Sequence, residues 1–254
     1  MADGPRILVI DIEVMAGLAM VFQSNENHIG IDQIIQPTRI ICFAAQWYGE
    51  KKMMFHSEWG DGYDDMILAL WNLMDDADYV VGYNSTSYDV KYIQAAFLNA
   101  GMEPPSPHKN VDLMREIRRC FKSMSGKLDW WGRQLQIGKK VENGGIRLWK
   151  ALAFPESPEE QAKAQRLMMV YNKQDVKLTV ELYERLLPWL GSLNVALYAD
   201  DPTERRCMNC GSTHLQSRGW AYTKVARYRQ FACQQCGKWM RDKRAESVSE
   251  MRAV

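Results

Sequence analysis

The sequence predicts an α/β fold in which helices cover a mixed sheet, followed by a much smaller second domain. Three observations predict this organisation. The apolar run at residues 7–13 is typical of a central strand that is buried on both faces. A long helical segment at 158–187 is ended by Pro188. Beyond that helix, two Cys-x2-Cys pairs lie close to the C-terminal end of the 254-residue chain.

The first strand carries two acidic side chains on one face. In the run ILVIDIE, successive side chains alternate between faces, so Asp11 and Glu13 point the same way. Acidic residues in a strand with two apolar faces are rarely buried without a partner, and no Lys or Arg follows Arg6 in this stretch. The pattern therefore favours a functional role for this pair. The next strands are expected at 39–49 and 51–57, as a hairpin in the same sheet.

A further short strand is expected at 79–83, and it breaks at Gly82–Asn84. The helix that follows is expected to be capped by Ser87 or a neighbour and to end near Gly101. Asp89 falls in its first turn, where a carboxylate is often present only for the cap and the helix dipole.

The long helix adds one tyrosine and one more carboxylate. Tyr171 and Asp175 are four residues apart and share a helical face, although such a pair alone is ordinary for an amphipathic helix. Two carboxylates from a strand, one from a helix start and one from a helix face can meet at a sheet edge. Cations must then relieve their repulsion, which suits a two-metal site for phosphodiester hydrolysis.

Taken in order, the motifs DIE, GYNSTSYD and YNKQD resemble the three motifs of the DEDDy 3′–5′ exonucleases, D-x-E, N-x(2–3)-[FY]-D and Y-x3-D. Tyrosine in the third motif, where a sister class carries His, distinguishes the DEDDy class. The chain is most similar to the proofreading domain of B-family DNA polymerases, including the stretch VDLMREIRR…GKLDWWGRQLQIGKK. It is too short for palm, fingers and thumb, so it resembles free-standing bacteriophage exonucleases over residues 5–190. The resemblance implies a ribonuclease H-like fold.

The resemblance also implies roles for the acidic residues. Asp11, Glu13 and Asp175 would hold a catalytic Mg²⁺ or Mn²⁺, and Asp11 would bridge to a second ion that Asp89 helps to hold. These two ions are the cofactors expected at the active site.

The remaining motif residues are expected to position the reactants. Tyr171 would orient the attacking water, because a phenol with a pKa near 10 is poorly suited to removing its proton. Asn84 and Tyr88 are expected to contact the substrate. A basic residue often assists the scissile phosphate in B-family relatives, and the sequence does not choose among the candidates Lys127, Lys139 and Lys140.

Four cysteines near the C-terminal end predict a structural metal site. Twenty-two residues separate the two pairs, and a glycine follows each pair. This spacing is typical of one structural Zn²⁺, and the alternating segment between the pairs resembles the hairpin of a zinc ribbon. Disulfides or redox motifs are the competing interpretation, but no signal peptide precedes the fold, which favours a reducing cytoplasm. The expected ligands are Cys207, Cys210, Cys233 and Cys236.

Charge divides the chain at the same place. Residues 203–254 carry a net charge of +7, whereas residues 1–202 carry −6. Basic residues interleaved with aromatic ones favour contact with nucleic acid, with Arg227, Arg229 and Lys238 as candidates. A small ribbon also needs aromatic residues for its core and basic residues for solubility, and docking to a protein stays open. The expected domains are an exonuclease at 1–198, a linker at 199–206, the ribbon at 207–244 and a disordered tail at 245–254.

The expected reaction is hydrolysis of single-stranded DNA from its 3′ end to nucleoside 5′-monophosphates, in phage DNA replication, proofreading or degradation. Two alternatives stay open. An exoribonuclease is one, because the metal site contacts phosphate and does not choose the sugar. The other is a non-catalytic adaptor whose ribbon docks a DNA polymerase or another replication protein. No apolar run reaches the roughly 20 residues that a membrane span needs, so no membrane partner and a cytoplasmic location are expected.

Overall fold

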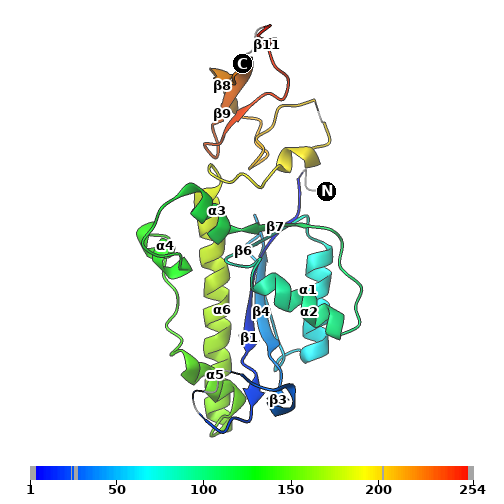
Figure 1. The fold of residues 1–254 in the computed structure, drawn as a ribbon, viewed down its shortest axis with the longest axis vertical. Helices are drawn as coiled ribbons and strands as arrows, with labels where there is room; N and C mark the ends of the chain where they lie inside the picture. The colour runs from blue at the N-terminus through cyan, green and yellow to red at the C-terminus, as the bar shows by residue number, and fades with distance from the viewer. Residues whose placement is uncertain (1–3, 24, 26–27, 202, 251–254) are drawn as a thin grey trace. The chain divides into compact units, whose positions relative to one another are not determined.

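The computed structural model describes residues 4–23, 25, 28–201 and 203–250 (Figure 1). The chain divides into two compact units, one formed by Arg6–Leu182 and one formed mainly by the residues from Tyr183 onwards. The division falls within the helix that ends at residue 186, and the domain boundary expected at residue 198 stays a prediction. In the smaller unit, Asn209 donates hydrogen bonds to the carbonyl oxygens of Leu187 and Leu190, just beyond that helix.

The larger unit is built on a five-stranded mixed sheet of order β5-β4-β1-β6-β7. The central strand β1 (Ile7–Met15) is antiparallel to β4 (Arg39–Trp47) and parallel to β6 (Tyr79–Gly82). The outer strands are β5 (Met53–Ser57) and β7 (Lys109–Asp112). The predicted α/β class, with its antiparallel first portion, is confirmed.

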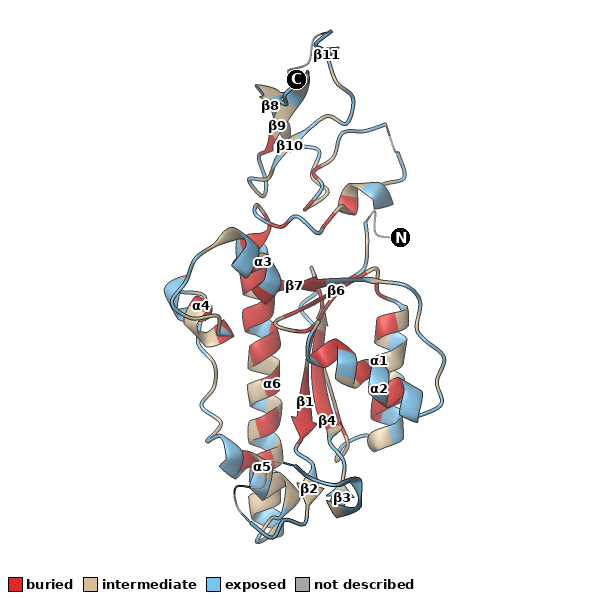
Figure 2. Ribbon diagram, viewed as in Figure 1, coloured by how far each residue is buried: buried red, intermediate tan, exposed pale blue. Residues whose placement is uncertain are grey.

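One face of this sheet packs against two helices, α1 (Tyr63–Asp75) and α2 (Asp89–Asn99). Leu8, Ile10 and Ile12 of β1 form a core there with apolar side chains of both helices. Figure 2 shows β1 and β4 coloured as buried along almost their whole length. This burial confirms that the run ILVIDIE is a strand covered on both faces.

The opposite face packs against α5 (Ile146–Ala153) and α6 (Pro158–Leu186). Met15 lies in a second apolar cluster with Leu148 of α5 and Met168 of α6. Asp11 and Glu13 share this face with Met15, because they are separated from it by even numbers of residues. The strand therefore presents its two carboxylates to α6.

The long helix has the start and end that its sequence predicts. Pro158 occupies the first helical position, and the Ser157 hydroxyl accepts a hydrogen bond from the Glu160 amide at 3.2 Å. The N-cap of α2 is Tyr88, a neighbour of Ser87 as expected, but the Tyr88 side chain makes no capping bond. The Ser87 hydroxyl donates instead to Asn84 Oδ1 at 3.0 Å. None of the helices in the described part of the chain is long and apolar enough to span a membrane.

Shorter elements complete the larger unit. They are β2 (Leu18–Ala19), a 3₁₀ turn at Ile31–Gln33, β3 (Ile34–Gln36), α3 (Leu113–Cys120) and α4 (Leu128–Gln134). β2 and β3 pair with each other in a separate small sheet.

The smaller unit has a sheet centred on β9 (Ala226–Cys233), after a 3₁₀ turn at Val195–Tyr198. β9 pairs with β8 (Leu215–Tyr222), which confirms the predicted hairpin. Its other edge is shared by β10 (Trp239–Arg241) and β11 (Ser247–Val248). β11 lies in the segment expected to be disordered, and it forms because it satisfies backbone groups of β9 that β10 leaves open. Residues 251–254 of that expected tail lie outside the described residues, and the linker at 199–206 stays a prediction.

Candidate active site

Three of the predicted acidic residues meet between β1 and α6. One carboxylate oxygen of each of Asp11, Glu13 and Asp175 lies within 4.8 Å of the others. Asp89 belongs to the same group of charges, because its Oδ1 accepts a hydrogen bond from the amide of Ile12, between the two acidic residues of β1, at 3.3 Å. Three separate elements, β1, α2 and α6, thus bring four carboxylates together.

Burial makes this cluster unfavourable as a group of free anions. The exposed fraction is 9% for Glu13, 6% for Asp89 and 2% for Asp175. Burial and the neighbouring Asp175 raise the pKa of Glu13 to about 8, and burial raises the pKa of Asp89 to about 6. Burial and then Asp89 and Glu13 also raise the pKa of Asp11 well above its ordinary value. Bound cations would remove this penalty.

The donor atoms fit hard divalent cations. Carboxylate oxygens are the ligands that Mg²⁺ and Mn²⁺ prefer. Asp175 Oδ1 is buried and has no hydrogen-bond partner among the described residues. An unpaired buried carboxylate oxygen is costly unless a cation or a donor meets it. The cluster is therefore suited to hold metal.

Lys140 is the basic residue that reaches the cluster. Its ammonium donates hydrogen bonds to Asp175 Oδ2 and, at 3.3 Å, to the hydroxyl of Tyr171. Burial opposes the charged form, but Asp175 outweighs it and raises the pKa of Lys140, so the ammonium stays charged. The other two lysines considered for assisting the phosphate have other surroundings. Lys127 is the N-cap of α4, and the backbone carbonyl of Lys139 accepts a hydrogen bond from the Gln174 side chain.

Tyr171 lies one helical turn before Asp175, as the spacing predicts. Burial and the adjacent Asp175 raise the pKa of Tyr171 to about 12. Because its phenol stays protonated at neutral pH, it can donate or accept a hydrogen bond but cannot serve as a base. This supports the expected positioning role.

Asn172 is a site residue that the sequence analysis missed. Its side chain is fully buried, and its Nδ2 donates to the backbone oxygen of Asp11 at 3.0 Å and to Asp11 Oδ2 at 2.7 Å. The amide thereby fixes the orientation of the carboxylate. The sequence could have revealed this residue, because positions 168, 172 and 179 all lie along the buried face of α6. A polar amide on a buried helical face must have a hydrogen-bond partner.

Replacement of Asn172 by Leu is expected to weaken Mn²⁺ binding and hydrolysis by roughly 10- to 100-fold, the usual cost of losing a residue that orients a metal ligand. Calorimetric titration of Mn²⁺ measures the first effect without relying on activity. Thr179→Val is a matched control, because it removes a buried hydrogen bond to the Asp175 carbonyl on the same helix. Equal losses in both variants would contradict a specific role for Asn172.

The metal-free protein is expected to lose thermal stability as the pH rises from about 5 to about 9. The folded state raises the pKa of Glu13 from 4.5 to about 8, so it binds more protons than the unfolded chain in this window. That contribution is complete below pH 4.5 and is lost as the pH passes about 8. Differential scanning calorimetry should show the decline, Glu13→Gln should flatten it, and Mg²⁺ should reduce it most at high pH. A melting temperature that rises across this window would contradict the expectation.

The two other residues of the second motif have different surroundings. Asn84 adopts a left-handed conformation (φ 62°), and its backbone N–H donates to Asp112 Oδ1 at 3.0 Å, which holds the turn after β6. Tyr88 is 43% exposed, and its ring centroid lies 4.9 Å from that of Tyr92. A partly exposed ring next to buried carboxylates could contact a base, so the expected substrate contact of Tyr88 stays a prediction.

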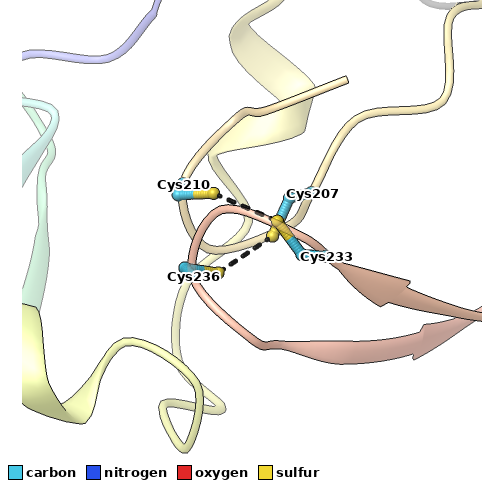
Figure 3. Close-up of side chains that lie close together, drawn as sticks. All are labelled: Cys207, Cys210, Cys233 and Cys236. Carbon is cyan, nitrogen blue, oxygen red and sulfur yellow. Dashed lines mark hydrogen bonds between the residues drawn. The ribbon is translucent and has the colours of Figure 1, made fainter. Parts of the chain in front are cut away.

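The four cysteines of the smaller unit converge from two turns (Figure 3). The Sγ atoms of Cys207 and Cys236 are 3.5 Å apart, and those of Cys210 and Cys233 are 3.6 Å apart. These distances are too long for disulfides, and they approach the edge of about 3.8 Å that a Zn–S bond of about 2.3 Å gives in a tetrahedron. Four thiols in this arrangement fit a structural zinc ion.

The three basic residues expected to bind nucleic acid have different surroundings. The Lys238 ammonium donates to the Leu190 carbonyl oxygen at 2.6 Å, so it already supports the fold of the smaller unit. Arg227 and Arg229 lie on β9 and stack on Trp220. The lysine is therefore engaged in a hydrogen bond within the protein, whereas the two arginines stack on an aromatic ring.

The sequence profile of one protein family, the RNase H superfamily, matches residues 34–187. This range contains Asp89, Tyr171 and Asp175, and β1 with its two carboxylates precedes it. Among solved structures, the family B DNA polymerase of the hyperthermophilic archaeon Pyrobaculum calidifontis has a similar fold, with a TM-score of 0.54 and 21% identity. The similarity covers 72% of this chain but only 25% of the polymerase. A search among curated proteins found no match.

Proposed function

The chain belongs to the RNase H superfamily, and we propose that within it the protein is a metal-dependent 3′–5′ exonuclease acting on single-stranded DNA. The observation that carries the proposal is the convergence of four carboxylates, three of them buried, with Lys140 and Tyr171. The acidic cluster and the superfamily both support a nuclease. The direction of digestion and the DEDDy class rest on the resemblance of the three motifs.

In the proposed reaction, water attacks the terminal phosphodiester, a new O–P bond forms and the bond to the 3′ oxygen breaks. The products are a nucleoside 5′-monophosphate and a strand with a new 3′ hydroxyl. Two bound Mg²⁺ or Mn²⁺ ions would lower the pKa of the attacking water and stabilise negative charge on the phosphate and on the leaving oxygen. Asp11, Glu13 and Asp175 would hold these ions, and Asp89 would help to hold one.

The remaining residues would orient the reactants. The protonated hydroxyl of Tyr171, held by Lys140 at 3.3 Å, would position the water. The Lys140 ammonium would offset negative charge as it builds up on the phosphate. Asn172 would keep the Asp11 carboxylate in one orientation.

Single-stranded DNA is proposed over RNA, because the resemblance is to domains of DNA polymerases. Digestion of matched DNA and RNA strands, with products resolved at nucleotide length, tests this choice. Faster stepwise shortening of DNA is the expected result. Faster shortening of RNA would make the protein an exoribonuclease.

A polymerase-docking adaptor without activity is the second candidate, and it would need no functional acidic site. Calorimetric titration with Mg²⁺ and Mn²⁺ separates the two, because only the nuclease requires binding at the carboxylates. The retained set of four acidic residues favours the nuclease.

A further inference from the structure

One face of the β8–β9 hairpin carries a row of alternating cations and rings. Arg227 and Arg229 are two residues apart on β9, so they share a face of the sheet. Trp220 of β8 lies opposite Arg229, and Tyr222 lies opposite Arg227. We name these four residues the arginine–tryptophan face.

Both arginines stack on the same indole. Their guanidinium carbons lie 4.6 Å and 4.4 Å from the Trp220 ring centroid, for Arg227 and Arg229 respectively. Stacking uses the flat side of a guanidinium and leaves its N–H groups free along the edge. It also restricts the side chain in advance, which lowers the entropy lost when a ligand binds. The guanidinium groups of Arg227 and Arg229 are therefore pre-organised, and each can donate two N–H groups to anionic oxygens.

Within the described part of the chain, neither Arg227 nor Arg229 takes part in an ion pair. The contrast is Arg205, which also stacks on a ring but forms a two-point pair with Asp242, with both N···O distances 3.0 Å. With a net charge of +7 over residues 203–254, this face is suited to a polyanion.

The two aromatic rings of this face differ in whether a base can stack on them. Trp220 is covered by arginine and so is not a free platform for a base. Tyr222, by contrast, is 73% exposed at the end of the same row. A planar ring beside two phosphate-binding groups matches a nucleotide strand, in which bases and phosphates alternate.

We propose that the arginine–tryptophan face binds a single-stranded nucleic acid, with Arg227 and Arg229 on successive phosphates and Tyr222 stacked on a base. This inference rests on the proposed function for the identity of the ligand, a nucleic-acid strand. It assigns a second binding surface that is separate from the acidic cluster. The surface would raise affinity without contributing to hydrolysis.

The test is fluorescence anisotropy of a labelled oligothymidylate with full-length Asp11→Ala protein, so that binding is measured without digestion. The double variant Arg227→Gln/Arg229→Gln is expected to bind about 10-fold or more weakly. Its slope of log K against log salt should be shallower by about 1.4, because two phosphate contacts on a single strand are lost. Tyr222→Ser should weaken binding by about 5-fold or more through loss of stacking.

The matched control is Arg241→Gln/Arg244→Gln, which removes the same charge elsewhere. Arg241 stacks on Tyr228 at 3.9 Å, on the opposite face of the sheet, and Arg244 is exposed after β10. This control should change affinity by less than about 2-fold, because it removes none of the proposed phosphate contacts. Equal weakening by both double variants would overturn the proposal in favour of general charge attraction. Unchanged binding by the first would overturn it in favour of another ligand, such as an acidic protein.

Zinc content checks that each variant is folded. If the glutamine variant loses zinc, Arg227→Lys/Arg229→Lys keeps both charges but loses the planar stacking and the paired donors. It is expected to bind several-fold more weakly with nearly the wild-type salt slope, and wild-type affinity would overturn the proposal. The catalytic proposal fails separately, because a wild-type protein that binds strands in this pattern without shortening them would leave this inference intact.

Discussion

Replacement of Asp175 by Asn is expected to reduce strand hydrolysis by roughly 10³-fold while the protein stays folded. Asp175 supplies one of the three oxygens that lie within 4.8 Å of one another, and it also binds the Lys140 ammonium. Asparagine has the same shape but no charge, so it would hold a divalent cation poorly. Folding should suffer little, because the substitution removes charge from a cluster whose members raise one another's pKa.

Steady-state rates on a single-stranded oligonucleotide and the melting temperature measure the two parts of this expectation. Glu184→Gln is the matched control, because Glu184 is an exposed acid on the same helix. The control should retain wild-type rates. An Asp175→Asn protein that keeps its activity would show that the acidic cluster is not the catalytic centre.

Replacement of Cys233 by Ser is expected to abolish zinc binding and to unfold the sheet formed by β8, β9, β10 and β11. Among the described residues after 206, the only buried ones are Cys207, Asn209, Ala232 and Cys233. Such a small core cannot stabilise a sheet, whereas zinc binding contributes about 10–16 kcal/mol in zinc-finger peptides. The metal would therefore supply most of the stability of this region.

Elemental analysis and hydrogen exchange test the effect of Cys233→Ser. The wild-type protein should contain one zinc per chain and protect the amides of β9, and the variant should lose both. Cys120→Ser, outside the cluster, should keep both. Retained protection in a zinc-free Cys233→Ser protein would mean that the sheet does not depend on a metal.

The sequence predicted the positions that depend on periodicity. Alternation along β1 placed Asp11 and Glu13 on one face, and the four-residue spacing placed Tyr171 beside Asp175. These predictions succeed because strand and helix geometry fix which side chains share a face. The fold class followed from the same patterns.

Positions that depend on tertiary contacts were not predictable in this way. Spacing could not choose Lys140 among three lysines, because a long side chain in a loop reaches its partner only through the fold. The bonds from Asn172 to Asp11 join residues 161 positions apart. The sequence groups Lys238 with Arg227 and Arg229 as a candidate contact to nucleic acid, yet the Lys238 ammonium donates to the Leu190 carbonyl.

Backbone hydrogen bonds are a second kind of contact that side-chain patterns do not predict. The polar segment after residue 244 carries no apolar pattern, so the sequence suggested disorder. Ser247 and Val248 form β11 because they meet unpaired backbone groups of β9, and side-chain composition does not report this. Similarly, Ser87 is a good capping residue, but its hydroxyl bonds to Asn84 in the turn before α2.

The most direct test of the central claim is digestion of a 5′-labelled single-stranded oligonucleotide, with and without Mg²⁺, by wild-type protein and by Asp11→Ala. A metal-dependent 3′–5′ exonuclease gives a ladder that shortens one nucleotide at a time with wild-type protein and Mg²⁺ only. The Asp11→Ala protein should leave the strand intact. Equal digestion by both proteins, or immediate release of the labelled 5′ nucleotide, would contradict the assignment.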